Sequence, residues 1–259
     1  MDITYLSSPS GTNMADQWFE IADLDHFWVR RRFQVFRTLM DPLGVRPRIV
    51  GEVGCGHGLV QHQFHSAYGV DVLGFDLNAN GLRASCAQHQ PRYYYNVFDR
   101  NGSFKQHFDL IFLFDVIEHI EDEDAFMAAV LFHLKPGGMI AINVPALQSM
   151  WSVYDETVGH VRRYTVDSLR TLADRTTLTM KAISYWGMPL LPLLMARKAR
   201  LAMSTEADAI VNTGFRPPSA RANRLLSGLA ALESIPQTVA GTSVMGLFQL
   251  APGGREVAP

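Results

Sequence analysis

The chain has 259 residues, of which 47% are hydrophobic and 19% charged, and its formal net charge at pH 7 is −2. This length and apolar content can bury one large α/β core, so we expect a single globular domain. Charges of both signs are interspersed without a basic tract, which disfavours nucleic acid as a partner. The two cysteines, Cys55 and Cys86, are too few for a disulfide scaffold and form no metal-binding pattern, as expected in a reducing cytoplasm.

The sequence predicts neither a secretory leader nor a transmembrane segment. The first residues show no basic or apolar leader pattern. The longest apolar run, 188–196, is interrupted by Pro189 and Pro192 and is shorter than the ~20 residues that a membrane span requires. We therefore expect a cytoplasmic protein.

Predicted strands and helices alternate along most of the chain. In the first half we expect strands over 48–53, 71–75, 93–97, 109–114 and 139–144, and helices over 59–68, 81–89 and 121–134. In the second half we expect a helix over 166–174, strands over 178–185 and 241–250, and an insertion over 187–240 that contains a helix over 220–232. This alternation predicts an α/β fold with a Rossmann-like, doubly wound parallel sheet.

The most informative feature is the glycine-rich turn after the first strand. Its glycines, Gly54, Gly56 and Gly58, lack a Cβ, so the backbone can turn sharply and lie against a ligand. The next helix then directs its unpaired N–H groups at that ligand. A dinucleotide-binding fingerprint would have glycine or alanine at the position of Leu59. The acidic Glu52 suits a cationic cofactor better than the negatively charged diphosphate of a dinucleotide. A turn that binds no ligand is the alternative.

Acids stand where the next two strands are expected to end. Asp76 lies about 20 residues beyond the loop, where a carboxylate can accept hydrogen bonds from ribose hydroxyls. A helix cap or turn is the alternative, because Asn78 and Gly81 follow closely. Asp99 ends the third strand segment, and a plain turn is an equally good reading of it. Ligands of open α/β sheets bind at the carboxyl ends of the strands, so these residues share one rim.

Three motifs in chain order resemble the class I S-adenosylmethionine-dependent methyltransferases. The acidic-x-Gly-x-Gly-x-Gly pattern from Glu52 to Gly58 resembles their motif I. The run FDLIFLFDVIEHI over 108–120, with the later Lys-Pro-Gly-Gly over 135–138, resembles the ubiquinone and menaquinone biosynthesis type. Weaker similarities follow: residues 151–165 resemble the lid of a bacterial subgroup, and the His-Phe-Trp over 26–28 resembles its N-terminal cap.

The resemblance implies a seven-stranded sheet whose seventh strand inserts antiparallel beside strand six. It also implies an N-terminal helical cap over 1–45, a methyltransferase domain over 46–252 with an insertion or cap over 187–240, and a tail over 253–259. The insertion could cover an apolar substrate, form a homodimer surface or lie on a membrane surface. A packing helix pair without a functional contact is the plain alternative.

By the same resemblance, S-adenosylmethionine is the expected cofactor. Glu52 or the neighbouring backbone would face its methionine ammonium, Leu77 would pack against the adenosine, and Asp99 would face the adenine amino group. Carbonyl groups near strand four would complete the pocket. The expected cofactor-binding residues are Glu52, Gly54, Cys55, Gly56, Gly58, Asp76, Leu77, Asp99, Phe114 and Asp115.

Methyl transfer requires a nucleophile aligned with the methyl group and often a base. His119 follows strand four, and an imidazole can act as a base at neutral pH. His160, with Asp155 nearby, could be a base oriented by a carboxylate. A structural role for His119 and lid-closing contacts for Asp155 and His160 are the alternatives. No HExxH motif, Cys/His set or acidic cluster predicts a metal.

Tyr154, Arg162 and Arg163 are the candidate substrate-binding residues, since a guanidinium matches a carboxylate or phosphate. Pairing with local acids is the alternative for each arginine. We therefore predict methyl transfer to an oxygen or nitrogen nucleophile of a small aromatic or polar metabolite. A C-methyltransferase of a quinone or lipid-like substrate, or a protein that binds S-adenosylmethionine without turnover, are alternatives. An NAD dehydrogenase is disfavoured by the glycine spacing.

Overall fold

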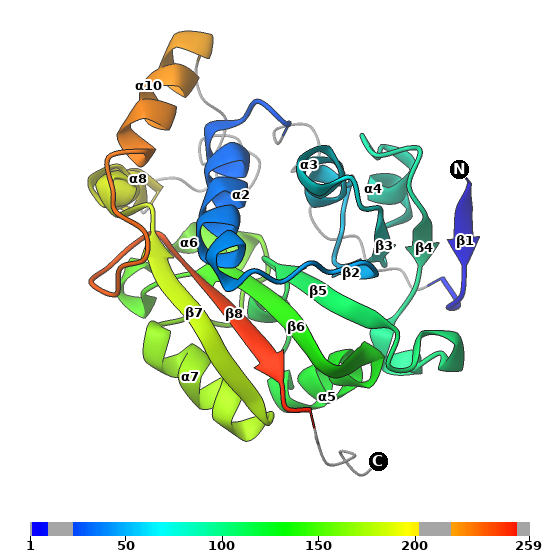
Figure 1. Cartoon of the computed structure of the whole chain (residues 1–259). Helices are drawn as coiled ribbons and strands as arrows, with labels where there is room; N and C mark the ends of the chain where they lie inside the picture. The colour runs from blue at the N-terminus through cyan, green and yellow to red at the C-terminus, as the bar shows by residue number, and fades with distance from the viewer. Residues whose placement is uncertain (1, 10–22, 202–218, 253–259) are drawn as a thin grey trace.

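The computed structural model describes residues 2–9, 23–201 and 219–252 and contains an eight-stranded sheet of order β1-β4-β3-β2-β5-β6-β8-β7 (Figure 1). The strands are β1 (Ile3–Tyr5), β2 (Val50–Val53), β3 (Val72–Asp76), β4 (Arg92–Tyr94), β5 (Phe108–Phe114), β6 (Leu134–Pro145), β7 (Leu178–Trp186) and β8 (Ser243–Leu250). Strand β8 lies antiparallel between β6 and β7, whereas the other neighbouring strands pair in parallel. The predicted Rossmann-like fold class and its antiparallel last strand are confirmed.

Helices cover both faces of this sheet. They are α2 (Phe27–Met40), α3 (Leu59–Tyr68), α4 (Ala79–Arg83), α5 (Glu123–His133), α6 (Val153–Thr157), α7 (Val166–Arg175), α8 (Leu191–Leu201) and α10 (Ala220–Ala230). In Figure 1, α2, α3 and α4 lie on one face, and α5 and α7 lie on the other. The architecture is therefore a three-layer sandwich around the sheet.

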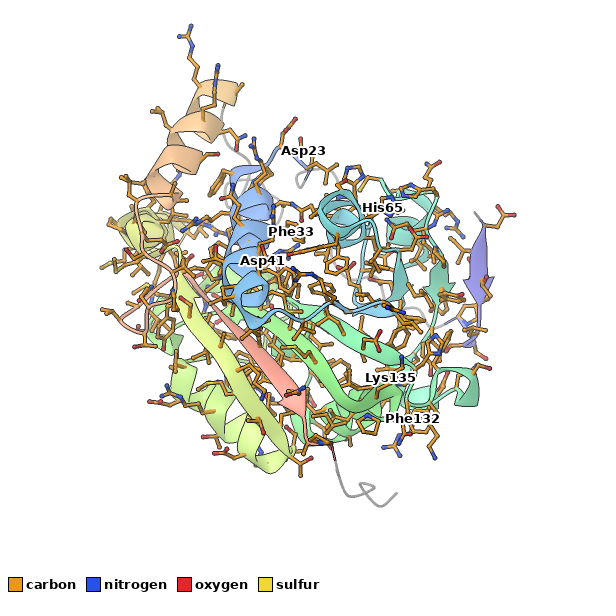
Figure 2. The ribbon with its side chains drawn as sticks, viewed as in Figure 1. Asp23, Phe33, Asp41, His65, Phe132 and Lys135 are labelled. Atoms are coloured by element: carbon orange, nitrogen blue, oxygen red, sulfur yellow. The ribbon has the colours of Figure 1, made fainter. Side chains whose placement is uncertain are left out.

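The core consists of two large apolar clusters, one on each face of the sheet. Strand β5 contributes side chains to both clusters. Leu110 and Phe112 pack toward α2 and α3, while Ile111 and Leu113 pack toward α5 and α7. Phe33 of α2 is buried in the cluster on the side of α2 and α3 (Figure 2). A central parallel strand is buried on both faces, which explains why its sequence is continuously apolar rather than alternating.

Several elements differ from the prediction. The sheet has eight strands instead of seven, because Ile3–Tyr5 adds a parallel edge strand beside β4. The helix expected over 81–89 covers only Ala79–Arg83, where Asn78 caps it by accepting from two backbone N–H groups. The strand expected over 93–97 ends at Tyr94, and a 3₁₀ turn over Val97–Asp99 follows. Each of these elements is short, and side-chain caps determine where it begins and ends.

The insertion between β7 and β8 contacts the N-terminal helix. Asn223 of α10 accepts a hydrogen bond from the backbone N–H of Phe27 (2.8 Å), and Glu233 pairs with Arg31 at 3.1 Å. No helix of the described residues is long and apolar enough to cross a membrane. The expected tail over 253–259 lies outside the described residues, and the division into cap, domain and insertion stays a prediction.

Candidate active site

The glycine loop forms a tight turn between β2 and α3. Gly54, Gly56 and Gly58 have φ angles of +75°, +52° and +80°, a region that side chains with a Cβ rarely adopt. A Cβ on Gly54 would lie 2.4 Å from Cγ2 of Val116, so the loop lies against the segment that follows β5. The loop backbone is fixed by hydrogen bonds from Gly54 N and Cys55 N to the carbonyl oxygen of Phe75. Glycine is therefore required at Gly54 by both conformation and space.

Asp76, at the end of β3, ties this loop to the neighbouring strand. Its Oδ2 accepts from the backbone N–H of Gly56 (2.6 Å), and its Oδ1 accepts from that of Asn78 (2.7 Å). The turn contact is thus present, and Asn78, not Asp76, caps α4. A carboxylate has about four acceptor positions, so Asp76 retains capacity for ribose hydroxyls.

The other residues predicted around the nucleoside lie in two different environments. Cys55 is buried with Tyr94, Leu77 packs against this pair, and burial raises the pKa of the Cys55 thiol well above its ordinary value. The side chain of Asp99 is exposed and accepts a hydrogen bond from Ser7 Oγ at 2.5 Å. Ser7 Oγ also accepts from the backbone N–H of Asn96, so the segment after β1 lies beside this end of the rim. The adenine contact of Asp99 stays a prediction.

Two buried carboxylic acids near the loop have carboxyl oxygens without a hydrogen-bond partner among the described residues. Glu52 is 3% exposed and Glu118 is fully buried. Among the described residues, Oε2 of Glu52 and both oxygens of Glu118 have no hydrogen-bond partner. Burial raises the pKa of Glu52 to about 8, although nearby Arg32 opposes the shift, and burial also raises the pKa of Glu118. Orphaned buried carboxyl oxygens are rare in proteins, and a bound cation would satisfy them.

Arg32 of α2 is the main residue that the sequence analysis missed. Its guanidinium lies 4.7 Å from the ring centre of Trp28 and 5.1 Å from that of Phe114, and it donates to Oδ2 of Asp115. Oδ1 of Asp115 accepts from the amide of Asn143 at 2.9 Å. The resemblance at residues 26–28 indicated this helix, but nothing in the sequence distinguished Arg32 from its arginine neighbours. The ion pair joins the N-terminal helix to the end of β5.

The predicted catalytic residues are brought together in the structure. Nδ1 of His160 lies 2.9 Å from Oδ1 of Asp155, and the two imidazole rings of His119 and His160 lie 4.8 Å apart, edge to face. Nδ1 of His119 lies 3.2 Å from the carbonyl oxygen of Gly159. Because oxygen is the acceptor in both contacts, each histidine donates a proton from Nδ1.

Burial and neighbouring charges shift the pKa values of Asp155 and His119. Burial tends to raise the pKa of Asp155, but hydrogen bonds from His160 and Arg163 lower it to about 2. Asp155 is fully buried, and Arg163 contacts both of its oxygens, at 2.8 Å and 3.1 Å. Burial and the adjacent His160 lower the pKa of His119 to about 4, so this imidazole is neutral at physiological pH. The site therefore holds a neutral imidazole beside one oriented by a carboxylate.

The predicted substrate residues have local partners. Arg163 is bound to Asp155, and Arg162 donates to the backbone oxygen of Glu121 at 2.8 Å. The ring of Tyr154 lies beneath the guanidinium of Arg197, 4.1 Å away. Arg163 is thus placed to orient Asp155, and direct substrate contact by these residues stays a prediction.

The same cluster could hold a divalent ion. One ligand atom from each of Glu118, His119 and His160 lies within 4.8 Å of the others. The sequence analysis expected no metal, and no regular spacing links these residues along the chain. The cluster can therefore act either as a base or as a ligand set.

Comparisons with known proteins agree with this fold. The family described as "Methyltransferase domain" matches residues 27–182. The ubiquinone biosynthesis O-methyltransferase of Nitrobacter winogradskyi is 30% identical over 95 residues, 35% of this chain and 36% of the relative. The trans-aconitate 2-methyltransferase of Deinococcus radiodurans is 31% identical over 101 residues, 38% of each chain. The matched region thus spans little more than a third of the length of these curated relatives.

A solved structure extends the likeness to nearly the whole chain. A chain in the complex between the Trm112 methyltransferase activator of Haloferax volcanii and a methyltransferase superposes with a TM-score of 0.60 at 13% identity. The superposition covers 95% of this chain and 99% of that chain, which supports the fold alone. Because the family match covers more than half of the residues, this chain belongs to the methyltransferase-domain family, as the sequence motifs predicted.

Proposed function

We propose that this protein transfers a methyl group from S-adenosylmethionine to an oxygen or nitrogen nucleophile of a small aromatic or polar metabolite. The observation that carries the proposal is a set of buried carboxyl oxygens, Oε2 of Glu52 and both oxygens of Glu118, that have no hydrogen-bond partner among the described residues and lie near the glycine loop and the two imidazoles. When bound, the cofactor would supply an electrophilic methyl group on a cationic sulfonium. The residues of this chain would bind it, align the acceptor and accept a proton.

The acids and the loop fit a cationic amino-acid ligand. The uncompensated Oε2 of Glu52 would accept from an ammonium group, and a nearby positive charge would favour the ionised carboxylate. The backbone of the glycine loop is open to close approach, because Gly54 has no side chain and is exposed. Asp76 lies beside Gly56, where it would receive ribose hydroxyls. The proposed cofactor residues thus form a continuous rim from β2 to β3.

Proton removal is assigned to the histidine pair. His119 is neutral, and its Nε2 is an available acceptor, so it can take a proton from a hydroxyl or amine. His160 is oriented by Asp155, which in turn is held by Arg163. General-base catalysis of this kind contributes about 10²–10⁴-fold to a rate. An acceptor hydroxyl or amine group of low pKa loses its proton easily, so the rate increase that the base provides should grow with the pKa of the acceptor group.

The test is methyl transfer from labelled S-adenosylmethionine to panels of phenols, catechols, carboxylic acids and amines. We expect label in an O- or N-methyl product, and a His119→Gln variant should transfer label at least about 100-fold more slowly. Label on carbon would favour the C-methyltransferase alternative. Binding of the cofactor without transfer to any acceptor class, including extracts of the host's metabolites, would favour a non-catalytic binding protein.

The acceptor class, the cellular location and the oligomeric state are proposals as well. We infer a small-molecule acceptor rather than nucleic acid from the interspersed charges, and a cytoplasmic location from the cysteine content. A homodimer is proposed because Leu225 of α10 and Leu232 just beyond it are 76% and 77% exposed. Light scattering during size-exclusion chromatography would show twice the chain mass, and a Leu225→Glu variant should elute as a monomer.

A further inference from the structure

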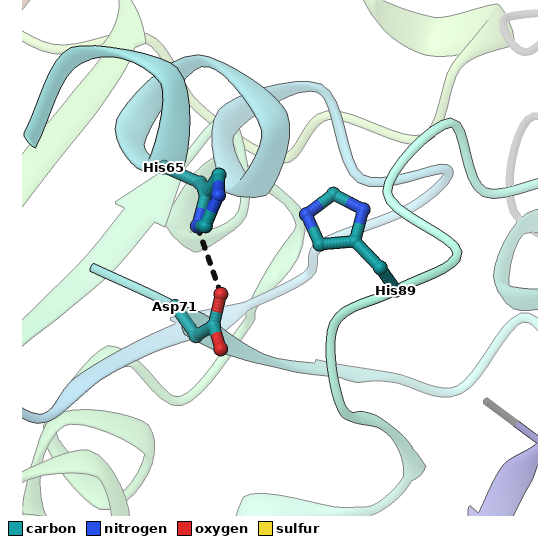
Figure 3. Close-up of side chains that lie close together, drawn as sticks. All are labelled: His65, Asp71 and His89. Carbon is teal, nitrogen blue, oxygen red and sulfur yellow. Dashed lines mark ion pairs between the residues drawn. The ribbon is translucent and has the colours of Figure 1, made fainter. Parts of the chain in front are cut away.

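We propose that His65, Asp71 and His89 bind a zinc ion at the end of the sheet opposite the glycine loop. The three side chains lie close together in Figure 3. Nδ1 of His65 is 2.8 Å from Oδ1 of Asp71, and the ring centres of His65 and His89 are 5.0 Å apart. One ligand atom from each residue lies within 4.8 Å of the other two.

The ligand types favour zinc. Two imidazole nitrogens and a carboxylate oxygen are common zinc ligands, with water in the fourth position of a tetrahedral site. Ligand atoms about 2.0–2.1 Å from a tetrahedral zinc ion lie roughly 3.3 Å from one another. The His65–Asp71 distance of 2.8 Å is already close to that value. The remaining separation, up to 4.8 Å, can close by rotation of the exposed side chain of His89.

A buried scaffold fixes the backbone that carries the three ligands. Gln61, one turn before His65 on α3, is fully buried and donates to the carbonyl oxygen of Val72 at 2.7 Å. Gln90, adjacent to His89, is also fully buried; its Oε1 accepts from Val72 N at 2.8 Å, and its Nε2 donates to Gln61 O at 3.0 Å. The two glutamines therefore link α3, the start of β3 and the segment before β4. Because this backbone is fixed, the site loses little freedom on binding a metal.

The location separates this site from methyl transfer. Asp71 immediately precedes β3, and Asp76 ends the same strand, so the two ends lie roughly 17 Å apart at ~3.3 Å per residue. His65 lies in the last turns of α3, whose first turn follows the glycine loop. A metal held by His65 and Asp71 would pin the far end of this helix to the sheet. The inference therefore concerns stability and stands independently of the proposed reaction.

The test uses untagged protein and zinc alone. We expect saturable binding of one Zn²⁺ by calorimetry and a rise in the unfolding temperature with zinc concentration. His65→Ala and His89→Ala should each weaken binding at least about tenfold, a loss of roughly 1.4 kcal/mol. His62→Ala, on the same helix but outside the cluster, should bind zinc like the wild type. Cobalt substituted for zinc should show the intense visible absorption of a tetrahedral site.

Two results would overturn the proposal. One is wild-type protein that binds zinc only non-saturably, with no change in unfolding temperature. The other is binding that survives in His65→Ala but disappears in His119→Ala, which would place the ion at Glu118, His119 and His160 instead. His65 is half-buried and His89 is exposed, so neither alanine variant removes a core side chain, and circular dichroism should show folded protein in each case.

Discussion

The hydrogen-bonded carboxylate of Asp155 should support both stability and activity. Its pKa is lowered to about 2 from an ordinary 3.8, which corresponds to roughly 2 kcal/mol of folded-state stability at neutral pH. Asn in its place would keep the shape but remove the charge that Arg163 and His160 contact, and breaking a buried pair costs about 3–5 kcal/mol. We therefore expect Asp155→Asn to lower the free energy of unfolding by about 2–4 kcal/mol at pH 7.

The pH dependence gives the sharper test. A carboxyl group whose pKa is lowered on folding contributes stability above its unfolded pKa, and that contribution is lost as the pH falls through the folded value. The difference in stability between wild type and Asp155→Asn should therefore be constant from pH 7 to about 5 and shrink between about pH 4 and 2. Urea unfolding at several pH values measures this difference. Asp167→Asn is the matched control, because Asp167 pairs with Arg170 on the surface and is 88% exposed.

A difference that stays constant down to pH 2 would refute the assignment of a lowered pKa to Asp155. In the activity assay, Asp155→Asn should reduce the turnover rate about 100-fold or more, because a neutral amide, which can also donate through its NH2 group, no longer favours the His160 tautomer with its proton on Nδ1. If turnover is unchanged while stability falls, the carboxylate is only structural. Asp167→Asn should leave both turnover and stability within about 1 kcal/mol of the wild type.

Three further predictions concern the rim. Gly54→Ala should abolish cofactor binding, measured by calorimetry. The φ angle of +75° at this position is strained for alanine, and the new Cβ would lie 2.4 Å from Val116. Cofactor affinity equal to that of the wild type would contradict the loop geometry. Arg32→Met should lower the free energy of unfolding by about 1.5–3 kcal/mol, because the partly buried carboxylate of Asp115 would lose its ionic partner and keep only the amide of Asn143, whereas Arg30→Met, at an exposed position, should change it by under about 0.5 kcal/mol. His119 has a pKa of about 4, so it stays neutral and kcat should not fall between pH 8 and pH 6. An inflection near pH 6.5 in the plot of kcat against pH, absent in His119→Gln, would contradict that pKa.

The sequence predicted the central elements well because their signals are strong. The continuously apolar run 109–114 could only be a buried strand, and β5 occupies Phe108–Phe114. The helix after it begins at Glu123, next to the acidic cap Asp122, close to the predicted start. The short elements were wrong or missing. Strand β1 has three residues, too few for any periodicity to indicate it.

The site was predictable only where residues lie near each other along the chain. Asp155 and His160 are five positions apart, and their contact was expected from that spacing. The ion pair of Arg32 with Asp115 joins segments 83 positions apart, and only the tertiary fold brings them together. Likewise, nothing in the sequence shows that the carboxyl group of Glu118 is fully buried and has no hydrogen-bond partner among the described residues, because burial depends on how segments distant in the sequence pack around it.

The most direct test of the central claim is calorimetry of S-adenosylhomocysteine binding to the wild type and to Glu52→Gln, with NAD as the control ligand. We predict one thioether nucleoside bound per chain, no binding of NAD, and an affinity at least about tenfold lower in Glu52→Gln, because a neutral amide cannot compensate the ligand's ammonium. Folded wild-type protein that does not bind S-adenosylhomocysteine, or that binds NAD instead, would contradict the proposed function.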